Sequence, residues 1–87
     1  MNTLNLIAAY DAACAAFVVT NDAHLAAWAA QKTAHIEFLL ASKEREIDPV
    51  AYAAARLAYD GAITACAQSS KARFDALAAK IRAKKAL

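Results

Sequence analysis

The chain has 87 residues, of which 61% are hydrophobic and 27 are Ala, and its formal net charge at pH 7 is +2. A single Gly and a single Pro all but exclude a β-sheet fold, because sheets need turn residues at regular intervals. No uncharged stretch reaches the roughly 18 residues that a membrane-spanning helix requires. The composition therefore predicts an all-α protein that does not contact a membrane.

Alanine favours the helix because it loses no side-chain entropy on folding, but it buries little apolar area. The larger apolar side chains are too few for a thick core in a chain of this size. We therefore expect one helical domain over residues 1–87 that gains further burial by self-association or by binding a partner.

The first predicted helix covers about residues 3–45. Larger apolar residues recur there mostly three, four or seven positions apart, which is the spacing of one helix face. A run of β-branched residues and helix-capping residues at 18–22 is the point where this helix would break. The recurring positions predict the buried face of this helix, and they are Leu4, Ile7, Cys14, Val18, Leu25, Trp28, Ile36 and Leu39.

A connector at residues 46–48 separates this helix from a second one over about residues 49–85. Asp48 is a preferred N-cap residue, and Pro49 suits the first helical position, where its missing N–H costs nothing. Gly61 and the Ser69-Ser70 pair are weak points. The sequence favours an alanine-rich antiparallel helical hairpin of two long helices, with a three- or four-helix bundle as the alternative.

In such a hairpin, residues whose numbers sum to about 94 lie at the same level. Asn21 then lies level with Phe74, and Trp28 packs against the small residues Cys66 and Ala67. Cys14 lies far from Cys66, so the geometry predicts two reduced thiols and no disulfide within the chain. Reduced thiols are typical of a cytoplasmic protein, which is the location we expect.

The sequence carries no recognisable catalytic or cofactor motif. One glycine leaves no phosphate-binding loop, and two histidines eleven residues apart on a helix are separated by about 16 Å, too far to share a metal ion. The acidic residues around the connector lack the glycine and the closing glutamate of a calcium loop. We therefore predict no enzyme activity, no metal site and no cofactor.

Two rows of side chains are candidate partner-binding surfaces. Tyr and Arg are enriched at the energetic centres of protein interfaces, and His and Trp can form a surface that responds to pH. The alternative for both rows is an ordinary boundary between core and solvent. The first row is Tyr52, Arg56, Tyr59 and Arg73, and the second is His24, Trp28 and His35.

Charge is distributed unevenly along the chain. Residues 1–68 carry a net charge of −3 and residues 69–87 carry +5. A basic segment can neutralise phosphates or contact an acidic partner, but it also suits the negative end of a helix dipole. The candidate contact residues at the basic end are Lys71, Lys80, Arg82, Lys84 and Lys85.

These observations predict a small protein–protein interaction module, of the adaptor or inhibitor type, that forms a homodimer. An antiparallel dimer would bring the basic end of one chain toward the acidic connector of the other. One alternative is a nucleic-acid-binding helical hairpin that uses its basic C-terminal end. The other is a small inhibitor, of the kind that phages encode, acting on a host or defence complex.

Overall fold

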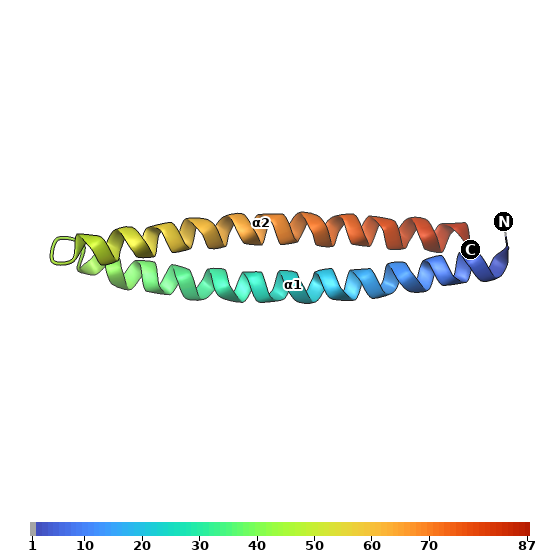
Figure 1. Ribbon diagram of the computed structural model, residues 1–87, viewed down its shortest axis with the longest axis horizontal. Coiled ribbons are helices and arrows are strands. Elements are labelled where there is room, and N and C mark those ends of the chain that lie inside the picture. Colours follow the sequence, from blue (N-terminus) through green and yellow to red (C-terminus); the bar gives the residue numbers. More distant parts are fainter. Residues whose placement is uncertain (1) are drawn as a thin grey trace.

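A computed structural model describes residues 2–87 as two helices, α1 (Thr3–Lys43) and α2 (Pro49–Ala86). The helices run antiparallel side by side, and both chain ends lie at the end opposite the connector (Figure 1). The hairpin is a rod with extents of 67 × 13 × 13 Å. The predicted two-helix hairpin is thereby confirmed, and the alternative of three or four shorter helices is excluded for the described residues.

Both helices begin at a side-chain cap. Asn2 accepts a hydrogen bond of 2.9 Å from the Leu4 N–H, and Asp48 accepts one of 3.0 Å from the Ala51 N–H. Pro49 occupies the first turn of α2, as the sequence predicts. The connector is slightly longer than expected, because α1 ends at Lys43 and not at residue 45.

The predicted weak points do not interrupt either helix. The Thr20 hydroxyl donates to the carbonyl oxygens of Ala16 and Phe17, at 3.0 and 3.1 Å. The Ser69 hydroxyl donates in the same way to the Cys66 carbonyl oxygen at 2.9 Å. Because each hydroxyl bonds back to its own helix, these polar residues are accommodated without a break.

The two helices meet along a heptad repeat of half-buried residues, with alternating spacings of four and three positions. In heptad notation the larger residues occupy position a, and small residues occupy nearly every position d. On α1 the a residues are Tyr10, Phe17, His24, Gln31 and Phe38, and the d residues are Leu6, Ala13, Thr20, Ala27, Ala34 and Ala41. On α2 the a residues are Tyr52, Tyr59, Cys66, Arg73 and Lys80, and the d residues are Ala55, Ala62, Ser69, Ala76 and Ala83.

The antiparallel register places a large residue opposite a small one in almost every layer. His24 bonds to Ser69 and Asn21 to Arg73, so facing residues have numbers that sum to about 93 or 94, as predicted. In this register Phe17 lies level with Ala76, and alanines at position d leave room for the aromatic rings opposite them. Small residues at such positions allow the two helix axes to approach closely.

The row that the sequence indicates as the buried face of α1 lies largely outside this interface, so that prediction is wrong. Leu4 is 71% exposed, and Leu25 and Trp28 are each 52% exposed. The contact between α1 and α2 is made mainly by alanines, aromatic residues and polar residues, and the branched aliphatic side chains other than Leu6 are left largely outside it. Trp28 accordingly flanks the interface and is not enclosed by Cys66 and Ala67.

No side chain among residues 2–87 is fully buried, and large apolar residues of both helices face outward. By length and composition alone, α1 is also apolar enough to cross a membrane. The expectation that the chain does not contact a membrane therefore stays a prediction.

Candidate protein-binding surface

The heptad positions divide the outside of the hairpin into two unlike faces. In an antiparallel pair, the e positions of both helices lie on one side of the interface, next to the a residues. The g positions lie on the other side, next to the d residues. We call the side formed by positions a, e and b the apolar face. We call the side formed by positions d, g and c the alanine face.

The apolar face carries two rows of exposed large side chains, one from each helix. Exposed fractions run from 36% for Leu77 to 71% for Leu4 and Phe74. Between the rows, half-buried aromatic rings at position a form the floor of the face. The exposed rows are Leu4, Ile7, Val18, Leu25, Trp28 and Leu39 of α1, and Ile63, Phe74, Leu77 and Ile81 of α2.

The alanine face consists mostly of methyl side chains. Every g position of α2 is Ala, and so is every g position of α1 from Ala9 to Ala30. This seven-residue alanine repeat is present in the sequence, and the sequence-based reasoning missed it. Its members on α2 are Ala51, Ala58, Ala65, Ala72, Ala79 and Ala86.

Aromatic stacking joins the helices on the apolar face near the connector. The His35 and Tyr59 rings stack with centroids 4.9 Å apart and planes 11° from parallel. The Phe38 ring lies 5.6 Å from Tyr52 and 5.5 Å from Tyr59. The Arg45 guanidinium lies 5.6 Å from the centre of the Tyr52 ring. These contacts fix the floor of the face at this end.

The middle of the apolar face is polar. Arg73 donates to the Asn21 side-chain oxygen at 3.4 Å, and His24 Nδ1 lies 3.0 Å from the Ser69 hydroxyl oxygen. The single proton of that hydroxyl goes to the Cys66 carbonyl oxygen, so Ser69 accepts the hydrogen bond and His24 Nδ1 donates it.

The structure brings the two predicted partner-binding rows together on this one face. His24, Tyr52, Tyr59 and Arg73 are half-buried at position a and contact or adjoin the opposite helix. The other three predicted residues occupy position e and are exposed, and they are Trp28, His35 and Arg56. The half-buried four are partly committed to the hairpin itself. The exposed three can reach a partner, although the His35 ring also stacks on Tyr59 of the opposite helix.

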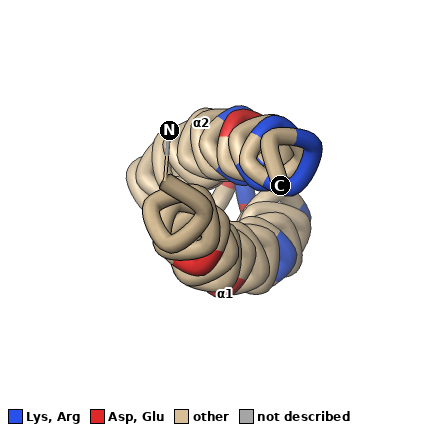
Figure 2. Tube along the Cα trace, turned by 90° about the vertical axis from the view of Figure 1, so that its right-hand side faces the viewer, with Lys and Arg blue, Asp and Glu red and all other residues tan. Residues whose placement is uncertain are grey.

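The basic residues of α2 do not form a single surface. The Lys80 ammonium lies 5.2 Å from the centre of the Phe17 ring, within the interhelical interface. The other four predicted residues are exposed at three different heptad positions, and they are Lys71, Arg82, Lys84 and Lys85. Figure 2 shows the resulting spread of positive charge around the free end of α2.

Near the chain ends, Tyr10 lies one turn from Cys14 on α1. A side-chain hydrogen bond to Cys14, with the charge effect of that thiol, raises the pKa of Tyr10 above its ordinary value of 10.0. Burial and the Asp11 carboxylate add smaller effects in the same direction. Both cysteines are free thiols, in agreement with the predicted absence of a disulfide.

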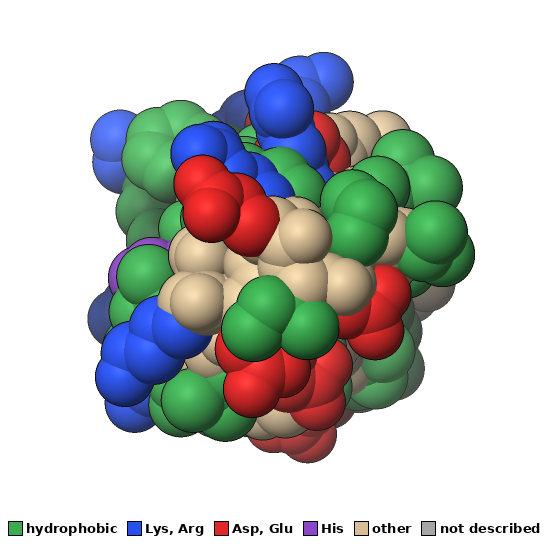
Figure 3. Space-filling model, turned by 90° about the vertical axis from the view of Figure 1, so that its left-hand side faces the viewer, with side chains coloured by type: hydrophobic (Ala, Val, Ile, Leu, Met, Phe, Trp, Pro, Cys, Tyr) green, Lys and Arg blue, Asp and Glu red, His purple; other side chains and the backbone are tan. Residues whose placement is uncertain are grey.

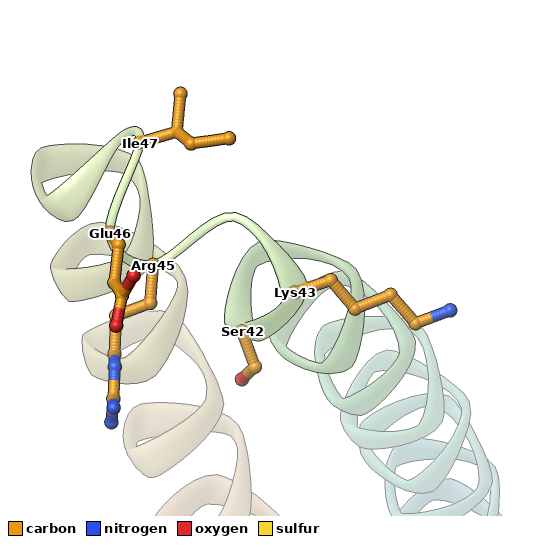
Figure 4. A pocket seen from close by; sticks show the side chains of 5 residues that line it. All are labelled: Ser42, Lys43, Arg45, Glu46 and Ile47. Atoms are coloured by element: carbon orange, nitrogen blue, oxygen red, sulfur yellow. The ribbon is translucent and has the colours of Figure 1, made fainter.

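A shallow hollow lies at the connector, lined by Ser42, Lys43, Arg45, Glu46 and Ile47 (Figure 4). Ile47 projects outward at the tip, and the Arg45 side chain runs back along the hairpin. All of these residues except Ser42 are exposed, so the hollow is open to solvent. Within residues 2–87, no three His, Cys, Asp or Glu side chains gather closely enough to hold a metal ion.

Comparison with known proteins leaves the geometry as the basis for a functional proposal. No protein-family description, no curated protein and no solved structure matches this chain.

Proposed function

We propose that this chain is a non-enzymatic protein–protein interaction module, of the adaptor or inhibitor type, that binds through its apolar face. The observation that supports this proposal is the exposure of both rows of large apolar residues along the hairpin. Exposed apolar patches of this extent are rare on proteins that act alone, and they mark sites of protein or membrane contact.

The side chains on this face suit a protein partner. Trp28, His35 and Arg56 supply the aromatic and guanidinium groups that dominate protein interfaces, and all three are exposed beside the aliphatic rows. Polar groups such as Asn21, Arg73 and His24 interrupt the apolar surface at mid-length. A lipid environment would solvate the Arg73 guanidinium poorly, because its partner Asn21 is neutral, whereas a protein surface can offer it further hydrogen bonds.

Site-specific photo-crosslinking in cells tests this proposal. We would replace Leu25 or Phe74, both on the apolar face, with p-benzoylphenylalanine and irradiate. Ala26 and Ala72 are matched controls, because both are exposed on the alanine face at nearly the same positions along the rod as Leu25 and Phe74. Protease-sensitive crosslinked products should form from Leu25 and Phe74, and their yield should be much lower from the two control positions.

Two outcomes would contradict the proposal. Equal adduct formation from all four positions would show that the apolar face has no special role. Adducts that a nuclease removes, formed from a probe placed at Lys84, would favour the nucleic-acid-binding alternative at the basic end. The crosslinked mass also separates a second copy of this chain from a different protein.

A further inference from the structure

We propose that the occupant of the apolar face is a second copy of the same chain, bound antiparallel with its connector at the opposite end. This inference deepens the proposed function and rests on it, because it names the partner of the same face. The dimer is a four-helix bundle in which α1 packs against α1 of the partner and α2 packs against α2 of the partner.

The area that the hairpin exposes matches what a stable dimer buries. A compact monomer of 9.2 kDa has an accessible surface of about 4,900 Å², whereas this chain exposes 6313 Å². The excess is about 1,400 Å² per chain, or about 2,800 Å² for two chains. That total lies within the ~2,000–5,000 Å² of obligate homodimer interfaces.

Charges beside the exposed row of α1 define a register for the dimer. Asp11 and Lys32 are the two charged residues at position b of α1, beside the exposed apolar row, and both are exposed. If α1 packs antiparallel against its copy so that Asp11 lies opposite Lys32, the two-fold axis passes between residues 21 and 22. The same register places Leu4 opposite Leu39 and Val18 opposite Leu25, and it brings the small Cys14 within one residue of the level of the large Trp28.

One charge pairing on α2 is compatible with the same axis. The charged residues of α2 at the edge of the apolar face include Asp60 and Lys84, both exposed. Pairing Asp60 with Lys84 of the copy puts the two-fold at residue 72 and brings Ile63 opposite Ile81. Residues 21–22 and residue 72 lie at the same level of the hairpin, because facing residues sum to about 93 or 94. One axis therefore satisfies both helices.

The charges of Asp11, Lys32, Asp60 and Lys84 also permit a second arrangement. In it both connectors lie at one end of the dimer, and Lys32 lies level with Asp60 of the copy. The overall charge distribution selects between the two arrangements. Figure 3 shows acidic and basic side chains intermixed at the connector end, where residues 43–48 carry a net charge of −1, and Figure 2 shows Lys and Arg at the opposite end of α2, where residues 80–85 carry +4. The antiparallel arrangement brings unlike ends together, whereas the alternative would place two basic ends side by side.

The polar middle of the apolar face lies at the two-fold axis. Asn21, His24 and Arg73 of both chains would form one polar layer there. A buried polar layer in a helical interface specifies register and oligomeric state at some cost in stability. Shifting either chain by one turn would leave these groups against aliphatic side chains.

A paired charge reversal tests the register. Asp11→Lys in one chain and Lys32→Glu in another make each homodimer repulsive at two symmetric sites, and the mixed dimer attractive at both. We expect the homodimer dissociation constant to rise roughly tenfold for each variant at low salt. Native mass spectrometry of the mixture should show mainly the mixed dimer, with a weaker preference at high salt. The matched control pair is Glu37→Lys and Arg82→Glu on the alanine face, which should mix statistically.

The following outcomes would overturn the proposed dimer. Statistical mixing of Asp11→Lys with Lys32→Glu would exclude this antiparallel register, since the arrangement with connectors together pairs residues 11 and 32 with α2. A wild-type monomer at all concentrations, or binding to phospholipid vesicles in place of self-association, would exclude the second copy. If crosslinks from Leu25 and Phe74 lead only to a different protein, the inference fails while the proposed function stands.

Discussion

Gly61 is the one glycine of the chain and lies in the interior of α2. A Cβ atom placed there would meet no atom within 4 Å. Because glycine costs a helix roughly 0.5–1 kcal/mol relative to alanine, Gly61→Ala should stabilise the protein by about that amount. Thermal unfolding followed by circular dichroism should show a midpoint several degrees higher. A lower midpoint would mean that another chain approaches the alanine face at this residue in solution.

Tyr10 offers a second single-residue prediction. Its pKa is raised chiefly by the hydrogen bond to Cys14, so Cys14→Ala should return the phenol toward its ordinary pKa of 10.0. Because the pKa of Tyr10 is higher in the folded than in the unfolded state, the interactions of its protonated phenol stabilise the fold fully below the unfolded-state pKa. This stabilisation is lost as the pH rises through the folded pKa.

The ultraviolet absorbance of tyrosinate measures this titration. A background with Tyr52→Phe and Tyr59→Phe isolates Tyr10 and keeps both aromatic rings of the interface. Cys66→Ala, far from Tyr10, is the matched control and should leave the titration unchanged. Identical curves with and without the Cys14 thiol would show that the thiol does not act on the phenol.

At the scale of the helices, the small d positions set how closely α1 and α2 approach. Ala62 is half-buried at position d, and Ala65, three residues on, is exposed at position g. A leucine at 62 must push the helices apart, so Ala62→Leu should cost about 1–3 kcal/mol of unfolding free energy. Ala65→Leu should change it by less than about 0.5 kcal/mol. Urea denaturation of the two variants makes the comparison, and equal losses would refute the close-packed alanine interface.

The helices and their ends could be predicted from the sequence because the signals are local. Asp48 and Pro49 mark the start of α2, and alanine favours the helix on both sides of the connector. The level of each residue in the hairpin then follows from the connector alone, which is why Asn21 meets Arg73, one residue from the predicted Phe74.

The choice of interface could not be read from hydrophobicity. A search for large apolar residues selects Leu4, Val18 and Leu25, which the structure leaves 71%, 57% and 52% exposed. Between two helices alone, close approach favours the side with alanine at most d positions, and larger aliphatic side chains remain for a further contact. The row of α1 predicted from the sequence is therefore an apolar surface, but it does not pack against α2.

For the whole molecule, the absence of any fully buried side chain among residues 2–87 ties stability to assembly. A hairpin whose apolar face is covered only in the dimer should unfold at a temperature that depends on protein concentration. A tenfold higher concentration adds about 1.4 kcal/mol per dimer, which should raise the unfolding midpoint by roughly 3–5 °C.

Substitutions on the two faces separate assembly from intrinsic helix stability. Leu25→Glu places a charge in the apolar face, so the variant should unfold at a lower temperature and lose the concentration dependence. Ala26→Glu places the same charge one residue away on the alanine face, and it should keep the wild-type dependence. If the wild-type midpoint were the same at every concentration, the hairpin would be stable as a monomer. Its exposed leucines, Trp28 and Phe74 would then be free for a different protein.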